Sequence, residues 1–92
     1  MNSVIEILID DRERSEVIRQ ALDTIKGITV KIQRLQVGDF QVDGRFLFER
    51  KTLPDFVVSV IDGRLFKQMT RLAMSPLNGV LVLEGTSRDL KP

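Results

Sequence analysis

The sequence contains no cysteine, histidine, tyrosine or tryptophan among its 92 residues. The lack of cysteine excludes disulfides, zinc fingers, iron–sulfur clusters and thiol nucleophiles. The lack of histidine excludes imidazole general bases, histidine-ligated metals and Ser-His-Asp triads. Any catalysis by these residues must therefore use Asp, Glu, Lys, Arg, Ser or Thr side chains, or a metal ion that oxygen atoms hold.

Strong net charge and long apolar runs are lacking as well. The formal charge is +1, so binding to a nucleic acid would need a local basic patch. The apolar stretches, such as 56–61, are far too short to span a bilayer, and no secretory signal is visible. We therefore expect no membrane partner and an intracellular location, in the cytoplasm or the nucleus.

The hydrophobic pattern alternates between strand and helix periods. In chain order it predicts a strand at 4–9, a helix at 15–26, a strand at 28–32, a hairpin over 37–51, helices at 52–61 and 64–74, and a strand at 80–83. This order is typical of an α/β domain with a mixed central sheet flanked by helices. We expect one domain over 1–92, with its core at about 4–84 and a loose tail at 86–92.

Each expected helix has an apolar face and a recognisable boundary. The first helix is expected to end at Gly27, and the second begins with a capping pattern, Thr52 to Asp55, with Pro54 in its first turn. The apolar face of the first helix is Val17, Ile18, Ala21, Leu22 and Ile25. In the third helix we expect Leu65, Phe66, Met69, Leu72 and Ala73 to face inward.

The turn of the hairpin decides which residues share a face of the sheet. A two-residue Asp43-Gly44 loop would mix apolar and charged side chains on both faces. A three-residue loop over 42–44, with Gly44 left-handed, separates them, so we predict that loop. It places Asp39, Gln41, Arg45, Leu47, Glu49 and Lys51 on one face, and Phe40, Phe46, Phe48 and the stem of Arg50 on the other.

The polar face of this hairpin brings two carboxylates and a lysine together. Carboxylates about 4 Å apart repel by about 4 kcal/mol at an effective dielectric near 20, and Asp10 or Asp11 would add to this. Such a cluster needs a proton, a cation or distance, and an all-oxygen site suits Mg²⁺ or Mn²⁺. From these residues alone a second interpretation stays open, in which they are solvated side chains on an exposed sheet.

The spacing of four short elements resembles one family. Val37-Gly38-Asp39-Phe40, then Glu49-Arg50-Lys51, then Asp55, resembles the G-D-Xn-E-R-K-X3-D signature of XPF/Hef-type structure-specific DNA endonucleases. Asp10-Asp11-Arg12-Glu13 is similar to their D-x-R-E element. The segment 62–68 is similar to their helix with G-R-L-x-x-Q. The elements follow the family's order from about Val4 to Glu84.

The resemblance implies a restriction-endonuclease-like core and a divalent cation, Mg²⁺ or Mn²⁺, that activates water against a DNA phosphodiester. It implies that Asp39 and Glu49 are the main metal ligands, with Asp10 close by as a third metal-site residue and the main-chain carbonyl after Glu49 completing the shell. Lys51 would orient the water or stabilise charge on the phosphate. Arg50 would serve the phosphate or brace the site, which makes residues 39, 49, 50 and 51 the expected catalytic set.

Further residues are expected around this centre. Arg12 would serve the phosphate or brace the site, and Glu13 would either contact an arginine there or act on the helix that follows it. For Asp55 we expect a structural role as the capping partner of Thr52. A DNA-backbone contact and an ordinary wet surface both fit the polar stripe on the third helix, which is Arg64, Lys67, Gln68 and Arg71.

The function expected from the resemblance is that of a metal-dependent endonuclease domain in DNA repair. It would hydrolyse phosphodiester bonds in branched double-stranded DNA with a fork, flap or nick, and it would pair as a homodimer or as a heterodimer with a related subunit. Active members usually carry more strand and helix material at their C-terminal side, so we expect a C-terminally short version of the fold.

Two other functions are alternatives to this one. The first is a catalytically inactive DNA-binding or assembly module of the same fold. The second is a receiver-like phospho-acceptor domain, suggested by Asp10-Asp11 after the first strand. It is disfavoured because Asp39 begins its strand and no lysine ends the strand at 80–83.

Overall fold

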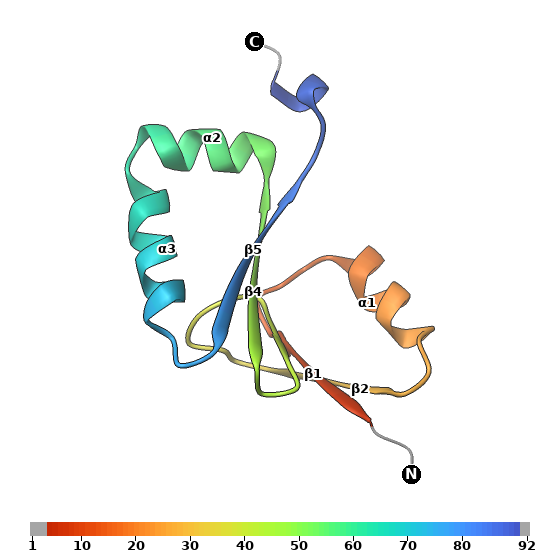
Figure 1. The fold of residues 1–92 in the computed structure, drawn as a ribbon. Helices are drawn as coiled ribbons and strands as arrows, with labels where there is room; N and C mark the ends of the chain where they lie inside the picture. The colour runs from red at the N-terminus through yellow and green to blue at the C-terminus, as the bar shows by residue number, and fades with distance from the viewer. Residues whose placement is uncertain (1–3, 91–92) are drawn as a thin grey trace.

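A twisted sheet of five strands organises the chain, whose structure is a computed structural model that describes residues 4–90 (Figure 1). The strands lie in the order β2-β1-β3-β4-β5. β1 pairs with β2 and β4 with β5 in parallel, whereas β3 is antiparallel to both of its neighbours. The strands are β1 (Ile5–Asp10), β2 (Ile28–Gln33), β3 (Phe40–Val42), β4 (Phe46–Thr52) and β5 (Asn78–Glu84).

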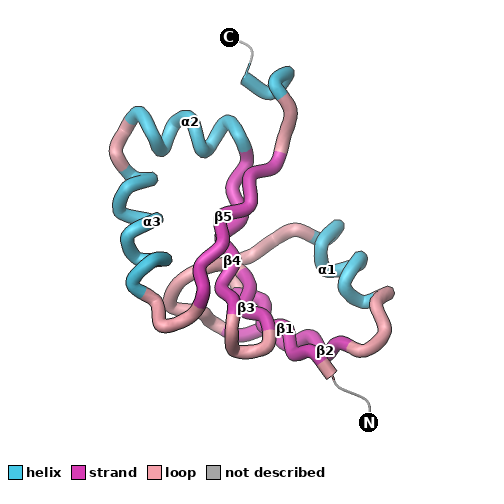
Figure 2. Tube along the Cα trace, viewed as in Figure 1, coloured by secondary structure: helices cyan, strands magenta, loops and turns pink. Residues whose placement is uncertain are grey.

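Helices lie on both sides of this sheet. They are α1 (Glu16–Asp23), α2 (Leu53–Ile61) and α3 (Arg64–Met74), and a short 3-10 helix, η1, covers Ser87–Leu90. Figure 2 shows α2 and α3 together on one side and α1 on the other. The α/β class with a mixed sheet flanked by helices is therefore confirmed.

The hairpin of β3 and β4 has the predicted parity but not the predicted register. Its loop is Asp43-Gly44-Arg45, whereas residues 42–44 were expected, and Phe40 pairs with Phe48. The loop moves because Asp43 as well as Gly44 takes a positive φ, 55° and 64°. Two left-handed residues are what an Asp-Gly turn of the primed type needs. Since the loop still has an odd number of residues, the polar and apolar faces are as predicted.

The first helix is shorter and more exposed than expected. Ser15 caps α1 through a bond from the Ile18 amide, but the helix ends at Asp23 although the prediction extended to 26. The Thr24 hydroxyl donates to the Ala21 carbonyl at 2.7 Å, and such local bonds compete with helix continuation. Val17 is 78% exposed, so the expected apolar face is not enclosed by residues 4–90.

The two helices after the hairpin begin as predicted. The Thr52 hydroxyl accepts a hydrogen bond from the Asp55 amide at 3.3 Å, which confirms the cap of α2. In α3 only Leu72 is fully buried, and the expectation that Phe66 and Ala73 face inward is wrong. Phe66 is 79% exposed because α3 meets the sheet along a strip that includes Met69 and Leu72.

The main buried cluster lies between α3 and the sheet. Leu8, Leu35, Leu47 and Leu72 form one buried cluster, with Val37, Met69 and Leu77 packed against it. Gly79 of β5 lies so close to α3 that a Cβ there would come within 2.7 Å of Leu72. This packing holds α3 and the segment 34–38 over one face of β3 and β4, and the candidate site lies at that face.

The tail contains one turn that the sequence pattern did not predict. The Asp89 carboxylate accepts a hydrogen bond from the Thr86 amide at 2.7 Å and so closes the start of η1. The last two residues of the predicted tail lie outside the described range. Within residues 4–90, no helix has the length and apolar character needed to cross a membrane.

Candidate active site

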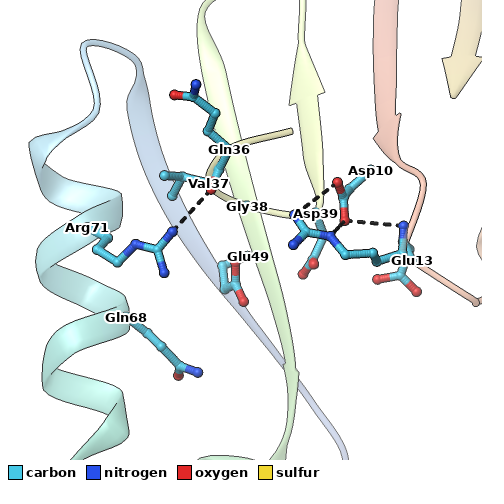
Figure 3. Close-up of a pocket in the computed structure, with 10 residues that line it drawn as sticks. Asp10, Glu13, Gln36, Val37, Gly38, Asp39, Glu49, Gln68 and Arg71 are labelled. Atoms are coloured by element: carbon cyan, nitrogen blue, oxygen red, sulfur yellow. Dashed lines mark hydrogen bonds and ion pairs between the residues drawn. The ribbon is translucent and has the colours of Figure 1, made fainter. Parts of the chain in front are cut away.

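A polar pocket of about 290 Å³ opens on the face of the sheet that α3 partly covers (Figure 3). Its walls come from the end of β1, the segment before β3, the middle of β4 and one side of α3. The side chains and backbone that line it are those of Asp10, Arg12, Glu13, Gln36, Val37, Gly38, Asp39, Glu49, Gln68 and Arg71.

Gly38 lines the pocket at a point where the backbone passes close to the core residue Leu47. Its φ is +82°, and a Cβ at this position would lie 2.8 Å from the Leu47 side chain. A glycine is therefore required both by the left-handed backbone and by the close approach to β4.

Asp39 is tied by its backbone to the strands on either side. Its amide donates to the Phe48 carbonyl at 2.8 Å, and its carbonyl accepts from the Asp10 amide at 2.8 Å. These bonds hold Asp39 directly before β3, where Phe40 pairs with Phe48, and Glu49 is the next residue along β4. Asp39, from the segment before β3, and Glu49, from β4, thus both line one pocket (Figure 3).

Asp39 and Glu49 are half-buried, and both resist ionisation. Burial raises the pKa of Asp39, and the nearby charges of Glu13 and Asp10 add to that rise, while a hydrogen bond from the Arg50 amide at 2.7 Å opposes it. Burial is also the main cause that raises the pKa of Glu49, and the charge of Asp39 is the second cause. A proton or a cation would relieve this unfavourable pairing.

Asp10 has the opposite character. The side-chain hydrogen bond from Arg12, at 2.8 Å between Nε and Oδ2, is the main cause that lowers the pKa of Asp10 to about 2. Its Oδ1 also accepts the Leu35 amide at 2.8 Å. Arg12 in turn donates to the Leu35 carbonyl at 2.8 Å. In this structure Arg12 therefore braces Asp10. Asp10 is a charged carboxylate at the pocket wall, and both of its oxygens accept hydrogen bonds.

Arg50 projects from the other face of β4, as its alternation with Glu49 predicts. Its side chain shares an apolar groove with Phe40 and Phe48. There the guanidinium pairs with Glu84 and lies 3.5 Å from Glu13 Oε1. Glu13 also accepts the amide of Ser15 at 2.9 Å, so it contacts both an arginine and the start of α1.

Lys51 follows Glu49 on the same face of β4. Its charge counteracts the rise in the pKa of Glu49, although its side chain is not part of the pocket wall. Beyond it, Asp55 is exposed and its amide serves the cap of α2. The roles expected for Lys51 and for the Asp55 side chain therefore stay predictions.

The polar stripe of α3 divides between two environments. Gln68 and Arg71 line the pocket, and Arg71 donates to the Gln36 carbonyl at 3.2 Å (Figure 3). The Gln68 Oε1 atom is buried and has no hydrogen-bond partner among the described residues. Arg64 instead pairs with Asp62 at 2.7 Å, and neither it nor Lys67 lines the pocket.

Sequence reasoning missed two residues at this site. Gln36 lines the pocket and supplies the carbonyl that Arg71 binds, and Glu84 holds Arg50 from the end of β5. No motif marks Gln36. Glu84 follows from the parallel register of β4 and β5, in which Thr52 pairs with Glu84, but that register is not visible in the sequence.

The donors that face the pocket suit a hard cation in part. Among residues 4–90, no three acidic side chains are gathered closely enough to enclose a metal ion by themselves. Asp39 and Glu49 nevertheless offer two half-buried carboxylates with raised pKa values. Mg²⁺ commonly takes one or two carboxylates and keeps several waters, so the residues present fit such an ion.

Comparison with known proteins supplies independent information. The family model described as the ERCC4 domain matches residues 9–92. The chain is 38% identical over 88 residues to the 3'-flap repair endonuclease Xpf of Saccharolobus solfataricus, an alignment that covers 96% of this chain and 37% of that protein. The chain thus spans little more than a third of this relative.

Solved structures agree with the fold. XPF from Aeropyrum pernix superposes with a TM-score of 0.78 at 34% identity, over 88% of this chain and 40% of that one. The same protein in complex with DNA superposes with a TM-score of 0.72 at 33% identity, over the same shares of the two chains. The resemblance to XPF-type nucleases and the restriction-endonuclease-like fold are confirmed.

Proposed function

Because the chain belongs to the ERCC4 domain family, we propose that it is a divalent-cation-dependent endonuclease domain that acts on branched DNA with a fork, flap or nick. The observation that carries this proposal is that Asp39, directly before β3, and Glu49, on β4, line one pocket. The relatives named as a flap repair endonuclease and as an XPF–DNA complex support it.

The proposed cation, Mg²⁺ or Mn²⁺, would be held by Asp39, Glu49 and the main-chain carbonyl after Glu49. When bound, it would lower the pKa of a coordinated water and neutralise charge on the phosphate. Asp39 and Glu49 repel each other less once a cation lies between them, which is consistent with their raised pKa values. Asp10 adds a fixed negative charge at the wall, and Arg12 holds it in place.

The basic and amide groups around the pocket would bind the DNA backbone. Arg71 and Gln68 line the pocket from α3, and Gln68 Oε1 has no partner there among the described residues. Lys51, next along β4 on the pocket side, would stabilise charge on the phosphate. Arg64 and Lys67 continue the polar stripe of α3 away from the pocket, where contacts to flanking phosphates would add salt-dependent affinity.

Cleavage of flap and fork DNA by the purified domain with Mg²⁺ or Mn²⁺ tests the proposal. Asp39→Ala and Lys51→Ala should each abolish cleavage while circular dichroism shows an intact fold. The matched control is Lys26→Ala, which removes an exposed lysine outside the pocket. Cleavage that persists in both site variants would contradict the assignment of the metal site.

DNA affinity measured at several salt concentrations tests the backbone contacts. Arg71→Ala should weaken binding similarly for all sequences and reduce the slope of log affinity against log salt by about 1. Lys26→Ala should leave that slope unchanged. An unaltered slope in Arg71→Ala would remove this arginine from the DNA contact.

The alternative is a DNA-binding or assembly module of the same fold without catalysis. It is favoured by one observation, that the side chains of Arg50 and Lys51 lie outside the pocket wall. Calorimetric titration with Mn²⁺ discriminates the two functions. A divalent-cation site that Asp39→Ala removes supports the nuclease, and its absence in the unaltered chain supports the binding module.

Pairing with a second copy or a related subunit is a further part of the proposal. Large apolar side chains are exposed on α2 and α3, among them Ile61 at 80% and Phe66 at 79%. Sedimentation velocity over a range of protein concentrations tests self-association. A monomer at all concentrations would exclude the homodimer and leave the heterodimer.

A further inference from the structure

Arg50 is held on the far side of β4 by two carboxylates from different parts of the chain. Glu84, at the end of β5, accepts a hydrogen bond from Arg50 Nε. Glu13, in the loop after β1, lies 3.5 Å from Arg50 Nη1. The side chains of Arg50, Glu13 and Glu84 are 26%, 8% and 38% exposed, so the contact is largely shielded from water.

The same residue is the backbone donor to the acidic pair. The Arg50 amide donates to Asp39 Oδ2 at 2.7 Å. Within the described residues this is the only hydrogen bond recorded for the Asp39 carboxylate. The direction in which the Arg50 N–H points therefore orients the Asp39 carboxylate in the pocket.

The register of the sheet explains how Glu84 reaches Arg50. Arg50 pairs with Val82 of β5, and Glu84 lies two residues further along the same strand. Because strand side chains alternate, Glu84 projects on the face that carries Arg50, away from Glu49. Its contact with Arg50 thus joins β5 to β4 at the point where β4 supplies Glu49 and the Asp39 donor.

The two carboxylates hold the guanidinium from different directions. Glu13 lines the pocket as well as contacting Arg50, whereas Glu84 lies in the groove on the opposite face. If Glu84 lost its charge, Glu13 would be the remaining carboxylate beside Arg50. The side chain would then be drawn toward the β1 side, and the backbone of β4 at residue 50 would turn with it.

We propose that Glu84 is a positioning residue for the acidic pair: by anchoring the Arg50 side chain it sets the main-chain N–H that orients Asp39. The effect of Glu84 on cation binding rests on the proposed function, but the effect of Glu84 on the orientation of Asp39 does not. The variants Glu84→Gln and Glu84→Asp test it, since the first removes the charge and the second keeps it. Glu16→Gln, at an exposed position, is the control.

The first measurement is made by NMR on the metal-free protein. In Glu84→Gln, the amide resonance of Arg50 and the carboxyl resonance of Asp39 should both move. In Glu84→Asp they should move less, and in Glu16→Gln they should stay in place. Unchanged Arg50 and Asp39 resonances in folded Glu84→Gln overturn the proposal. If that variant does not fold, unchanged resonances in Glu84→Asp overturn it equally.

The second measurement is the affinity for Mg²⁺. A residue that orients a metal ligand typically alters metal affinity by about tenfold or more when it is replaced, so Glu84→Gln should bind Mg²⁺ about tenfold more weakly. Glu16→Gln should bind as the unaltered protein does. If Glu84→Gln binds Mg²⁺ as tightly as the unaltered protein, Glu84 does not position the acidic pair for the cation. If the unaltered protein binds no Mg²⁺, the proposed function fails, and the NMR comparison still decides the role of Glu84.

Discussion

The carboxylates at the pocket fall into two kinds, which differ in what they are bonded to. Asp10 accepts hydrogen bonds from Arg12 and from the Leu35 amide, and its pKa falls to about 2. Asp39 and Glu49 have little such compensation, and burial raises the pKa of each. Ionised Asp10 therefore stabilises the fold. Ionised Asp39 and Glu49 destabilise it unless a proton or a cation binds them.

Replacing Glu49 by Gln should therefore stabilise the metal-free protein at neutral pH. A raised pKa in the folded state means that the destabilisation is present above that pKa and is relieved as pH falls through it. The thermal midpoint of Glu49→Gln should exceed that of the unaltered protein at pH 7, and the difference should shrink toward pH 4. Equal midpoints at pH 7 would mean that Glu49 is not destabilising in the absence of a cation.

Replacing Asp10 by Asn should have the opposite effect. Hydrogen bonds to a charged group contribute about 2 kcal/mol, so urea unfolding at pH 7 should show a loss of about that size. Because the pKa of Asp10 is lowered from 3.8 to about 2, its contribution is present above pH 4 and is lost as pH falls toward 2. The two proteins should thus converge in stability at pH 2, and a constant difference down to that pH would contradict this role.

Sequence reasoning identified the acidic residues but not their bonding. The predicted three-residue loop placed Asp39 and Glu49 on one face of the sheet, and both line the pocket. Two contacts depend on how β1, β4 and β5 come together. They are the hydrogen bonds from Arg12 to Asp10 and the ion pair of Arg50 with Glu84. Those contacts join segments far apart in the chain, and no local pattern encodes them.

At the level of elements, the segment before β3 is the part that a small change would disturb most. Gly38 carries a positive φ and lies against Leu47, and Asp39 follows it directly. Any side chain at Gly38 must therefore move either Leu47, which belongs to the core, or the backbone that presents Asp39.

Gly38→Ala and Gly27→Ala form a matched pair. Both glycines have nearly the same φ, +82° and +84°, but a Cβ on Gly27 would meet no atom within 4 Å. Gly27→Ala should cost about 1 kcal/mol for the left-handed backbone alone. Gly38→Ala should cost about 2–4 kcal/mol, since the overlap with Leu47 is added. Equal losses in urea unfolding would show that the contact with Leu47 relaxes freely.

The elements were predicted best where the pattern was local. The hairpin faces, the cap at Thr52 and the order of strands and helices were all correct. The end of α1 was wrong because the Thr24 hydroxyl competes with the helix, and the exposure of Phe66 was missed because periodicity does not tell whether a partner element covers a face.

For the whole molecule, the proposed cation should act as a stabilising ligand. A ligand that binds only the folded state raises its stability with concentration, by about 2.7 kcal/mol at a hundred times its Kd. The thermal midpoint should therefore rise as Mg²⁺ or Mn²⁺ is added, and neither Asp39→Ala nor Glu49→Gln should respond. Na⁺ at matched ionic strength is the control, and an equal rise with Na⁺ would indicate general screening.

Asp39 directly precedes the first strand of the hairpin and Glu49 lies on its second strand, whereas Asp10 and Gln68 come from distant parts of the chain. Hairpins form within microseconds, long before a sheet of mixed topology is complete. A divalent ion able to bridge residues 39 and 49 would therefore already favour the folding transition state. The ion should therefore raise the folding rate and lower the unfolding rate, so that the folding limb of a chevron plot moves up and the unfolding limb moves down.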